Sequence, residues 1–336
     1  METNRGMTVR FWGVRGSVPS PITGAEVENK VVEALALAAV RPDLINGSKE
    51  VLRAWVREHL PFEVRSTFGG NTTCVEIRCD DQLFILDMGT GLRELGVALM
   101  SEMFRNHGIK GTVLLSHVHW DHIQGYPFWA QLYMPRDRFK NVFTFYGGKD
   151  WDRSLEQVLR GQMNPPVFPV EHREIEQTAM QMKFHSVYDG MVIEMPARRG
   201  NVRIVCRKLN HPQETYGWRI EYNGAVVALT TDNEPYAGSP DRALVELATG
   251  ADIWMQDCQH SFDEYEGKIG IPKKGWGHSF PEANAETAKI AKPRLIVNMH
   301  HDPGSSDERI LALAARTQEL CGIRTIAAYE GLSLTA

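Results

Sequence analysis

Long uninterrupted apolar runs are missing from this sequence. A membrane-spanning helix needs about 18 or more consecutive apolar residues, and no stretch of the 336 residues approaches that length. The N-terminal segment METNRGMTVRFWG also lacks the apolar centre of a secretory signal peptide. The sequence therefore predicts a protein without a membrane span, and we expect a cytoplasmic location.

Cysteine is scarce, and neither charge is in large excess. The five cysteines are odd in number and widely spaced, and none forms a CxxC pair. This pattern argues against a disulfide framework and favours a reducing compartment. The formal net charge of −5 disfavours a surface that coats nucleic acid generally, although it is compatible with a local basic groove.

What the sequence does contain is a globular composition, with 43% hydrophobic and 24% charged residues. Strand and helix patterns alternate in both halves, which favours an α/β (α+β) fold of two packed sheets with helices outside. The expected strands are 7–13, 72–79, 82–89, 111–117, 142–147, 182–187, 201–209, 216–222, 225–232, 251–257 and 294–300. The expected helices are 91–104, 151–160, 241–248, 281–290 and 306–320.

A helical insertion interrupts this pattern at about residues 21–65. Residues 25–40 and 48–60 show helical periodicity, and Ser48 is the expected N-cap of the second helix. The insertion holds six basic and seven acidic residues, so it is nearly neutral. No repeat, low-complexity tract or linker divides the chain, so residues 1–336 are expected to form one domain. Dimerisation and coverage of a site are both open as roles for the insertion.

The segment HVHWDH contains the candidate metal ligands. It places His117, His119, Asp121 and His122 directly after an apolar strand, where side chains sit on a rigid platform and remain accessible. His117 and His119 can turn toward one ion, while Asp121 and His122 suit a second. Imidazole and carboxylate together favour Zn²⁺, with Mn²⁺ or iron as alternatives. Chance would produce this pattern in roughly one chain in a thousand.

HVHWDH resembles the HxHxDH signature of the metallo-β-lactamase superfamily, and the similarity extends from RFWGVRGS to NMHHDP. The resemblance implies a four-layer αββα sandwich with two metal ions. Three histidines would hold one ion, two histidines and an aspartate would hold the other, and a second aspartate would bridge both. The implied ligands are His117, His119 and His211 for the first metal, Asp121, His122 and His300 for the second, and Asp232 as the bridge. His300 is favoured over the adjacent His301 because it directly follows the strand LIVNM.

Within the superfamily, four stretches resemble the tRNase Z and cyclic-phosphate phosphodiesterase branch. They are FGGNTTCVEI, DMGTGLRELG, TTDNEP and GWGHSF. In that branch the histidine of the last motif donates a proton, which makes His278 the candidate general acid. Two features depart from the tRNA-processing enzymes: Leu229 stands where they carry a glutamate that supports this histidine, and their long basic Gly/Pro arm is not apparent.

These features predict a dinuclear metal-dependent phosphodiesterase that acts on a small cyclic phosphate or cyclic nucleotide. A hydroxide shared by the two metals would attack phosphorus, Asp121 would also orient that water, and His278 would protonate the leaving alkoxide. A tRNase Z-type endonuclease and an acyl ester, thioester or lactam hydrolase remain alternatives. A di-iron redox protein is disfavoured, because His119 occupies the position of its usual glutamate. The expected partner is a small phosphodiester, with nucleic acid less favoured, and a homodimer is an open expectation.

Four residues in or near these motifs have a structural interpretation as well as, or instead of, a functional one. Asp87 either orients a ligand histidine or simply forms the turn before Gly89. His278 could instead be a polar residue at a helix N-terminus, with Ser279 as N-cap. Trp120 and Trp129 flank the metal segment, and packing in the core is the expected role for both.

Overall fold

Fourteen strands form two seven-stranded sheets in the computed structural model, which describes residues 5–41, 44, 47–149 and 152–336. The first sheet has the order β14-β1-β2-β3-β4-β5-β6, with strands β14 Ser333–Thr335, β1 Met7–Gly13, β2 Cys74–Cys79, β3 Gln82–Leu86, β4 Lys110–Leu114, β5 Val142–Gly147 and β6 Gln181–Ser186. The second has the order β13-β12-β11-β10-β9-β8-β7, with strands β13 Thr325–Ala327, β12 Ile296–Met299, β11 Ile253–Asp257, β10 Ala225–Thr230, β9 Thr215–Tyr222, β8 Gly200–Leu209 and β7 Val192–Ala197.

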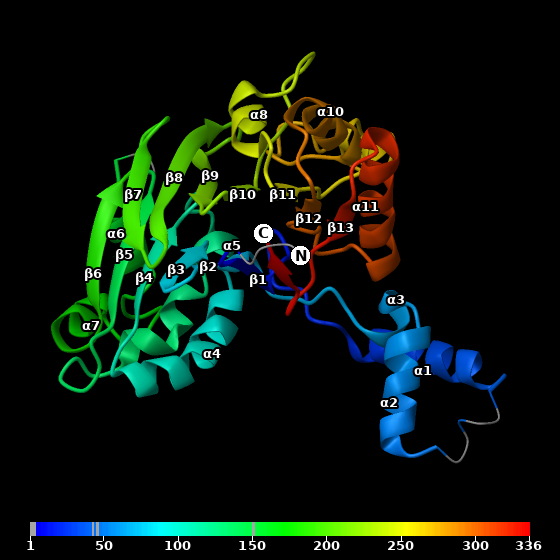
Figure 1. Cartoon of the computed structure of the whole chain (residues 1–336), viewed down its shortest axis with the longest axis horizontal. Coiled ribbons are helices and arrows are strands. Elements are labelled where there is room, and N and C mark those ends of the chain that lie inside the picture. Colours follow the sequence, from blue (N-terminus) through cyan, green and yellow to red (C-terminus); the bar gives the residue numbers. More distant parts are fainter. Residues whose placement is uncertain (1–4, 42–43, 45–46, 150–151) are drawn as a thin grey trace.

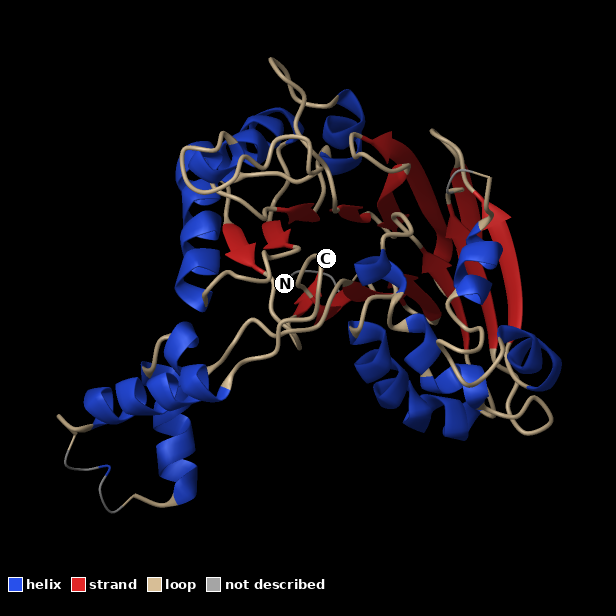
Figure 2. Ribbon diagram, turned by 180° about the vertical axis from the view of Figure 1, so that it is seen from behind, coloured by secondary structure: helices blue, strands red, loops and turns tan. Residues whose placement is uncertain are grey.

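Helices cover the outer face of each sheet (Figures 1 and 2). The longer helices are α4 Gly91–Asn106, α6 Leu155–Gly161, α7 His172–Thr178, α8 Arg242–Ala248, α10 Pro281–Ala291 and α11 Asp307–Cys321, and the four-residue helices are α5 Trp120–Ile123 and α9 Phe262–Tyr265. One apolar cluster joins α4 and α6 to the first sheet, and another joins α8 and α10 to the second. The expected four-layer αββα sandwich is confirmed.

The interior between the two sheets is filled because apolar residues alternate along the strands. In β1 the odd-numbered residues from Met7 to Gly13 are buried, and the even-numbered ones are partly or fully exposed. The strands β3, β4 and β5 run parallel, as do β10, β11 and β12. Parallel strands bring their carboxyl ends to one edge of a sheet, and the segments that follow them meet there.

The insertion forms an arm that extends away from the sandwich (Figure 1). We call residues 21–65 the arm. It contains α1 Gly24–Ala38, α2 Lys49–His59 and the short α3 Phe62–Arg65. Ser48 is the N-cap of α2, and its hydroxyl oxygen accepts a hydrogen bond from Val51 N at 3.4 Å. Both expected helices are therefore present, close to their expected bounds.

The structure also differs from the sequence expectations in places. The helix expected at 151–160 begins at Leu155, after Ser154 has capped it together with Gln157, and Trp151 lies outside the described residues. The sequence analysis missed β7, β13, β14 and α7. In the described part of the chain, none of the helices is long and apolar enough to cross a membrane.

Candidate metal centre

The expected metal ligands meet at one edge of the sandwich, although they come from both sheets. His117 follows β4, and Asp121 and His122 lie in α5. From the other sheet, His211 follows β8, Asp232 follows β10 and His300 follows β12. Asp232 and His300 adopt left-handed backbone conformations, with φ of 57° and 56°. Such conformations are uncommon for residues other than glycine and concentrate at functional sites.

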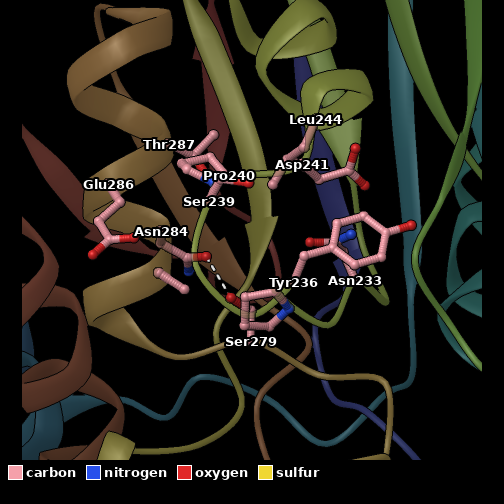
Figure 3. A pocket seen from close by; sticks show the side chains of 12 residues that line it. Asn233, Tyr236, Ser239, Pro240, Asp241, Leu244, Ser279, Asn284, Glu286 and Thr287 are labelled. Atoms are coloured by element: carbon pink, nitrogen blue, oxygen red, sulfur yellow. Dashed lines mark hydrogen bonds between the residues drawn. The ribbon is translucent and has the colours of Figure 1, made fainter.

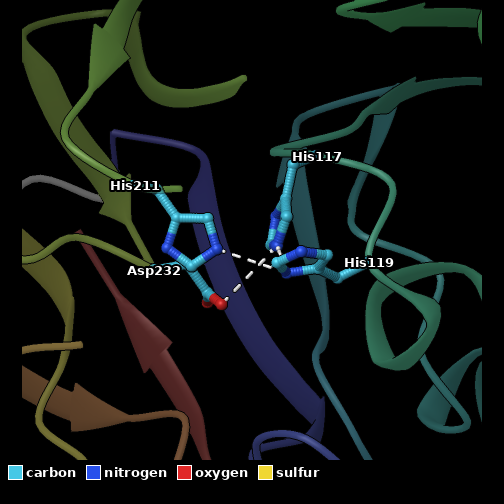
Figure 4. A group of neighbouring side chains, drawn as sticks. All are labelled: His117, His119, His211 and Asp232. Carbon is cyan, nitrogen blue, oxygen red and sulfur yellow. Dashed lines mark hydrogen bonds and ion pairs between the residues drawn. The ribbon is translucent and has the colours of Figure 1, made fainter. Parts of the chain in front are cut away.

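One group of ligand atoms comprises His117, His119, His211 and Asp232, and its members lie within 4.8 Å of one another (Figure 4). His119 Nδ1 is 2.8 Å from His117 Nε2 and 3.2 Å from His211 Nε2. Asp232 Oδ2 lies 3.6 Å from His117 Nε2. Three imidazole nitrogens and one carboxylate oxygen thus face a common point.

A second group comprises Asp121, His122 and His300. His122 Nε2 lies 3.2 Å from His300 Nε2 and 3.3 Å from Asp121 Oδ2. Asp232 Oδ1 lies 3.4 Å from His122 Nε2 and 3.2 Å from His300 Nε2. The two oxygens of Asp232 therefore face different groups, as a bridging carboxylate requires.

His301 takes no part in these groups. It is buried, and its Nε2 lies 2.9 Å from the carbonyl oxygen of Ala328, to which it donates. His300, in contrast, faces the carboxylates of Asp121 and Asp232. The geometry therefore favours His300 as the last ligand.

The protonation states suit a metal site. Burial, together with the neighbouring His122, lowers the pKa of His117 well below its usual value. Burial also lowers the pKa of His211 to about 4, and its Nδ1 donates to the carbonyl oxygen of Gly277 at 3.0 Å, which leaves Nε2 as a lone-pair donor. Burial opposes the charge of Asp232, but the surrounding histidines outweigh it and keep the pKa of this carboxyl low. Burial opposes the charge of His122, but Asp121, Asp232 and Asp87 outweigh it and raise the pKa of this ring well above its usual value, so His122 would release a proton on binding a metal. Imidazoles and ionised carboxylates are the donors that zinc and similar divalent metals take, so the residues fit two such ions.

Asp87 fixes the orientation of His122. Its Oδ2 accepts a hydrogen bond from His122 Nδ1 at 2.8 Å, and its Oδ1 accepts from Ser116 N at 2.7 Å. The His122 ring therefore presents Nε2 to the second group. Asp87 is also a turn residue, with φ of 60°. Both interpretations of Asp87 hold together.

His278 has a buried partner that carries no signal in the sequence. Asp257, the last residue of β11, lies with its Oδ2 2.8 Å from His278 Nδ1. Leu229, where a supporting glutamate was sought, lies instead in the core between the sheets. Burial opposes the charge of His278, but Asp257 outweighs it and raises the pKa of His278 to about 9. The ring centroid of His278 is 5.0 Å from that of His300, beside the second group.

A buried glutamate, also missed, holds the loop before His278. The carboxylate of Glu234 accepts hydrogen bonds from Gly275 N at 2.7 Å and from Gly277 N at 2.8 Å, and a third from the Tyr265 hydroxyl at 2.8 Å. Because the carbonyl of Gly277 also accepts from His211, one short segment positions both a candidate ligand and His278.

The expectation that Ser279 caps the following helix is wrong. Helix α10 begins at Pro281 with Phe280 as its N-cap residue. Ser279 Oγ donates instead to Asn284 Oδ1 at 2.7 Å, at the wall of a small pocket between α8 and α10 (Figure 3). Ser279 thus ties the segment after His278 to the side of α10.

The two tryptophans near the metal segment differ. Trp129 is fully buried against Phe143, as expected for core packing. Trp120, between His119 and Asp121, is 70% exposed, so the core role expected for it is wrong. Trp276, two residues before His278, is 51% exposed, and Lys273 Nζ lies 3.8 Å from the centre of its ring. The side chains of Trp120 and Trp276 are therefore exposed to solvent and lie close in sequence to the candidate site residues.

Comparison with known proteins gives consistent results. Residues 86–301 match the family described as the beta-lactamase superfamily domain, which is more than half of the chain. A ribonuclease Z from Mycobacterium avium is 26% identical over 258 residues, covering 71% of this chain and 84% of the relative. The structure also resembles the metallo-beta-lactamase fold protein YhfI from Bacillus subtilis, with TM-score 0.61, 16% identity, and coverage of 98% of this chain and 99% of that one. A diphosphatase from the PhnP family gives TM-score 0.58, 17% identity and 98% coverage of both chains. These two structural similarities concern the fold alone.

Proposed function

The chain belongs to the beta-lactamase superfamily, and we propose that it is a dinuclear metal-dependent phosphodiesterase for a small cyclic phosphate or cyclic nucleotide. That it is a metal-dependent hydrolase follows from the family and from the similarity to a ribonuclease Z. The observation that carries the finer proposal is the Asp257–His278 pair beside the two ligand groups. A phosphodiester releases an alkoxide, which needs a proton, and a positioned imidazolium can supply it.

In this proposal His117, His119 and His211 hold one metal, Asp121, His122 and His300 hold the other, and Asp232 bridges them. Two divalent cations there would lower the pKa of a shared water molecule and neutralise charge on the phosphoryl oxygens. Asp121 Oδ2 is fixed by the backbone N–H of Ser17 at 2.8 Å. This contact lets Asp121 orient the attacking water while it serves as a ligand.

His278 is the proposed proton donor. Its Nδ1 is engaged by Asp257, so Nε2 is the nitrogen that faces a substrate. A pKa raised to about 9 keeps the ring protonated at neutral pH, as a general acid requires. Asp257 stabilises the charged ring before the proton is transferred to the leaving oxygen.

The exposed surface around the site supports a nucleotide substrate. Trp120 and Trp276 can each stack on a nucleobase, an interaction worth about 1–3 kcal/mol. Lys273 lies over the ring of Trp276 and Lys274 is exposed, so this loop offers two cations to a phosphate. Both lysines lie in the loop that leads to His278.

RNA processing is the second candidate function, and the 26% identity to a ribonuclease Z favours it. A long RNA needs an extended basic surface. The arm does not supply one, because its six basic residues, three of them in α2, are balanced by seven acidic residues. This charge pattern supports the smaller substrate.

A substrate panel tests the proposal. The purified, metal-loaded protein should hydrolyse bis(p-nitrophenyl) phosphate faster than thioesters, and the opposite preference would refute a phosphodiesterase. Cyclic mononucleotides, cyclic ribose phosphates and a tRNA precursor then separate the substrate classes. Efficient cleavage of the tRNA precursor with no turnover of the cyclic compounds would favour the second candidate.

A further inference from the structure

Helix α10 carries a buried asparagine, Asn284, in its first turn. This residue stands between Ala283 and Ala285 and is only 1% exposed. Asparagine is a poorer helix former than alanine, and burying its amide costs free energy unless the polar atoms find partners. The contacts of this amide therefore explain why an asparagine stands here.

The amide of Asn284 is bonded to the two segments that carry Asp257 and His278. Its Nδ2 donates to the carbonyl oxygen of Asp257 at 2.8 Å. Its Oδ1 accepts from the hydroxyl of Ser279, the residue after His278, at 2.7 Å (Figure 3). One side chain of α10 thus holds the backbone on both sides of the Asp257–His278 pair.

A further hydrogen bond joins Asn284 to a buried polar network beneath the sheet. Gln256 Nε2 donates to Asn284 Oδ1 at 3.0 Å, and Gln256 Oε1 accepts from the hydroxyl of Thr230. Trp254 Nε1 donates to the same hydroxyl at 2.7 Å. Thr230 is the last residue of β10, two positions before Asp232. A satisfied buried network of this kind fixes the geometry of the segments that it joins.

The backbone next to the pair is tied together as well. The carbonyl oxygen of Ser279 accepts from Gln259 N at 3.1 Å and from His260 N at 3.3 Å. The segment that follows Asp257 therefore lies beside the segment that follows His278. Asn284 closes this arrangement from the side of α10.

The carboxylate of Asp257 depends on the position of its backbone. Its Oδ2 faces His278 Nδ1, and within the described part of the chain its Oδ1 is buried without a hydrogen-bond partner. Because no second donor orients the carboxylate, its place beside His278 follows from where the main chain of Asp257 lies. A misplacement of about 1 Å in a catalytic arrangement can cost about 100-fold in rate.

We propose that Asn284 is a positioning residue for the Asp257–His278 pair, an inference that rests on the proposed function, in which His278 protonates the leaving alkoxide. Its hydrogen bonds reach Asp257, Ser279 and Gln256, and none of these is a proposed metal ligand. Asn284 acts by holding the carboxylate and the ring at the separation that proton transfer needs. The competing role is purely structural: the amide would fasten α10 to β11 without influencing the pair.

The first test observes the Asp257–His278 hydrogen bond itself and needs no substrate. In the zinc-loaded protein, the His278 Nδ1 proton should give a downfield proton NMR signal, which is assigned by its absence in H278A. N284A should weaken or abolish this signal. N284D should do the same, because an ionised carboxylate fills the space of the amide but cannot donate to the Asp257 carbonyl. The control T287A shortens another buried side chain, one turn further along α10, and should keep the signal.

The second test compares leaving groups. N284A should lower kcat for a cyclic nucleotide by about 10- to 100-fold with little change in KM. Hydrolysis of bis(p-nitrophenyl) phosphate should fall far less, because p-nitrophenolate leaves without a proton. S279A removes only the hydrogen bond to Ser279 and should change both readouts in the same direction by a smaller factor, which keeps the proposal testable if N284A folds poorly.

A double-mutant cycle then asks whether Asn284 acts through His278. In the H278A background, N284A should add almost nothing to the loss of rate, because both changes affect one step. Circular dichroism checks that the variants are folded. An unchanged NMR signal in N284A would overturn the proposal, as would equal losses on the two substrates or independent losses in the cycle. A wild-type protein that hydrolyses no phosphodiester would refute the proposed function instead, and the NMR signal would still decide whether Asn284 positions the pair.

Discussion

The carboxylate of Asp257 lies 2.8 Å from His278 Nδ1, and both side chains are buried. Asp257 comes from the end of β11 and His278 from the loop before α10. The carboxylate stabilises the charged form of the ring and engages Nδ1, which leaves Nε2 for the proposed proton transfer. In the proposed function this pair would distinguish an acid-assisted reaction from one that relies on metal ions alone.

Replacing Asp257 by Asn should move the alkaline limb of the pH profile. In the proposed role His278 acts as an acid, so activity should fall as pH rises through its pKa, which is raised to about 9. Without the carboxylate, the negative charge that raises this pKa is gone, and the limb should shift to lower pH by roughly 1–3 pH units. The rate of hydrolysis of a cyclic nucleotide, measured as a function of pH, gives this shift. E174Q, a change on the exposed face of α7, is the control, and an unmoved limb in D257N would contradict the assignment.

Replacing His278 by Ala should lower kcat by about 100- to 10,000-fold for substrates with an alkoxide leaving group. The loss should be much smaller for bis(p-nitrophenyl) phosphate, because p-nitrophenolate leaves without a proton. Metal content should stay the same, as His278 is not a proposed ligand. Equal losses on both substrates, or loss of metal, would show that His278 acts otherwise.

Replacing Asp232 by Ala should remove activity and most metal from both positions, because each oxygen of this carboxylate faces a different ligand group. Elemental analysis of the purified variant measures the metal content. The variant D87N is a milder comparison, because it removes no ligand and only weakens the orientation of His122. It should lower metal affinity by about 10- to 100-fold. Two full equivalents of metal in D232A would disprove the bridging role.

The ion pair of Asp80 with Arg199 should contribute stability that depends on pH. Asp80 Oδ2 accepts hydrogen bonds from Arg199 Nε at 2.7 Å and from the Tyr222 hydroxyl at 2.6 Å. These contacts lower the pKa of Asp80 to about 2, below the roughly 3.9 of an unfolded chain. The stabilisation is therefore fully present above pH 4 and is lost as pH falls toward 2. Urea midpoints of wild type and D80N should differ at pH 6 and converge as pH decreases, and a constant difference would contradict this prediction.

The parts of the site that could be predicted from the sequence are those with local signals. HVHWDH places four ligand candidates within six residues, and strand patterns located His211, Asp232 and His300 at strand ends. The fold could be predicted for a similar reason, since most strands alternate or form short apolar runs. Strands β13 and β14 have three residues each, too few for a pattern to emerge.

The contacts that join distant segments could not be predicted. Asp257 and Glu234 carry no motif of their own, and only the folded chain shows which histidine and which loop they hold. The left-handed backbone conformations of Asp232 and His300 could not be predicted either, because neither residue type indicates such a conformation. The exposure of Trp120 could not be predicted either, because its hydrophobicity predicts burial, whereas in α5 it is Asp121, His122 and Ile123 that are buried.

The segment that leaves the sandwich for the arm passes directly over the candidate metal centre. Arg15 pairs with Thr72 and His301, Ser17 holds Asp121, and a side chain on Gly16 would overlap the His300 ring. Beyond these contacts, Ser20 N bonds to Gly70 O at 2.8 Å and closes the base of the arm. A shortening that stays within residues 21–65 would therefore leave Ser17 on Asp121 and Gly16 beside His300, whereas a cut nearer to β1 would release these contacts with the candidate ligands.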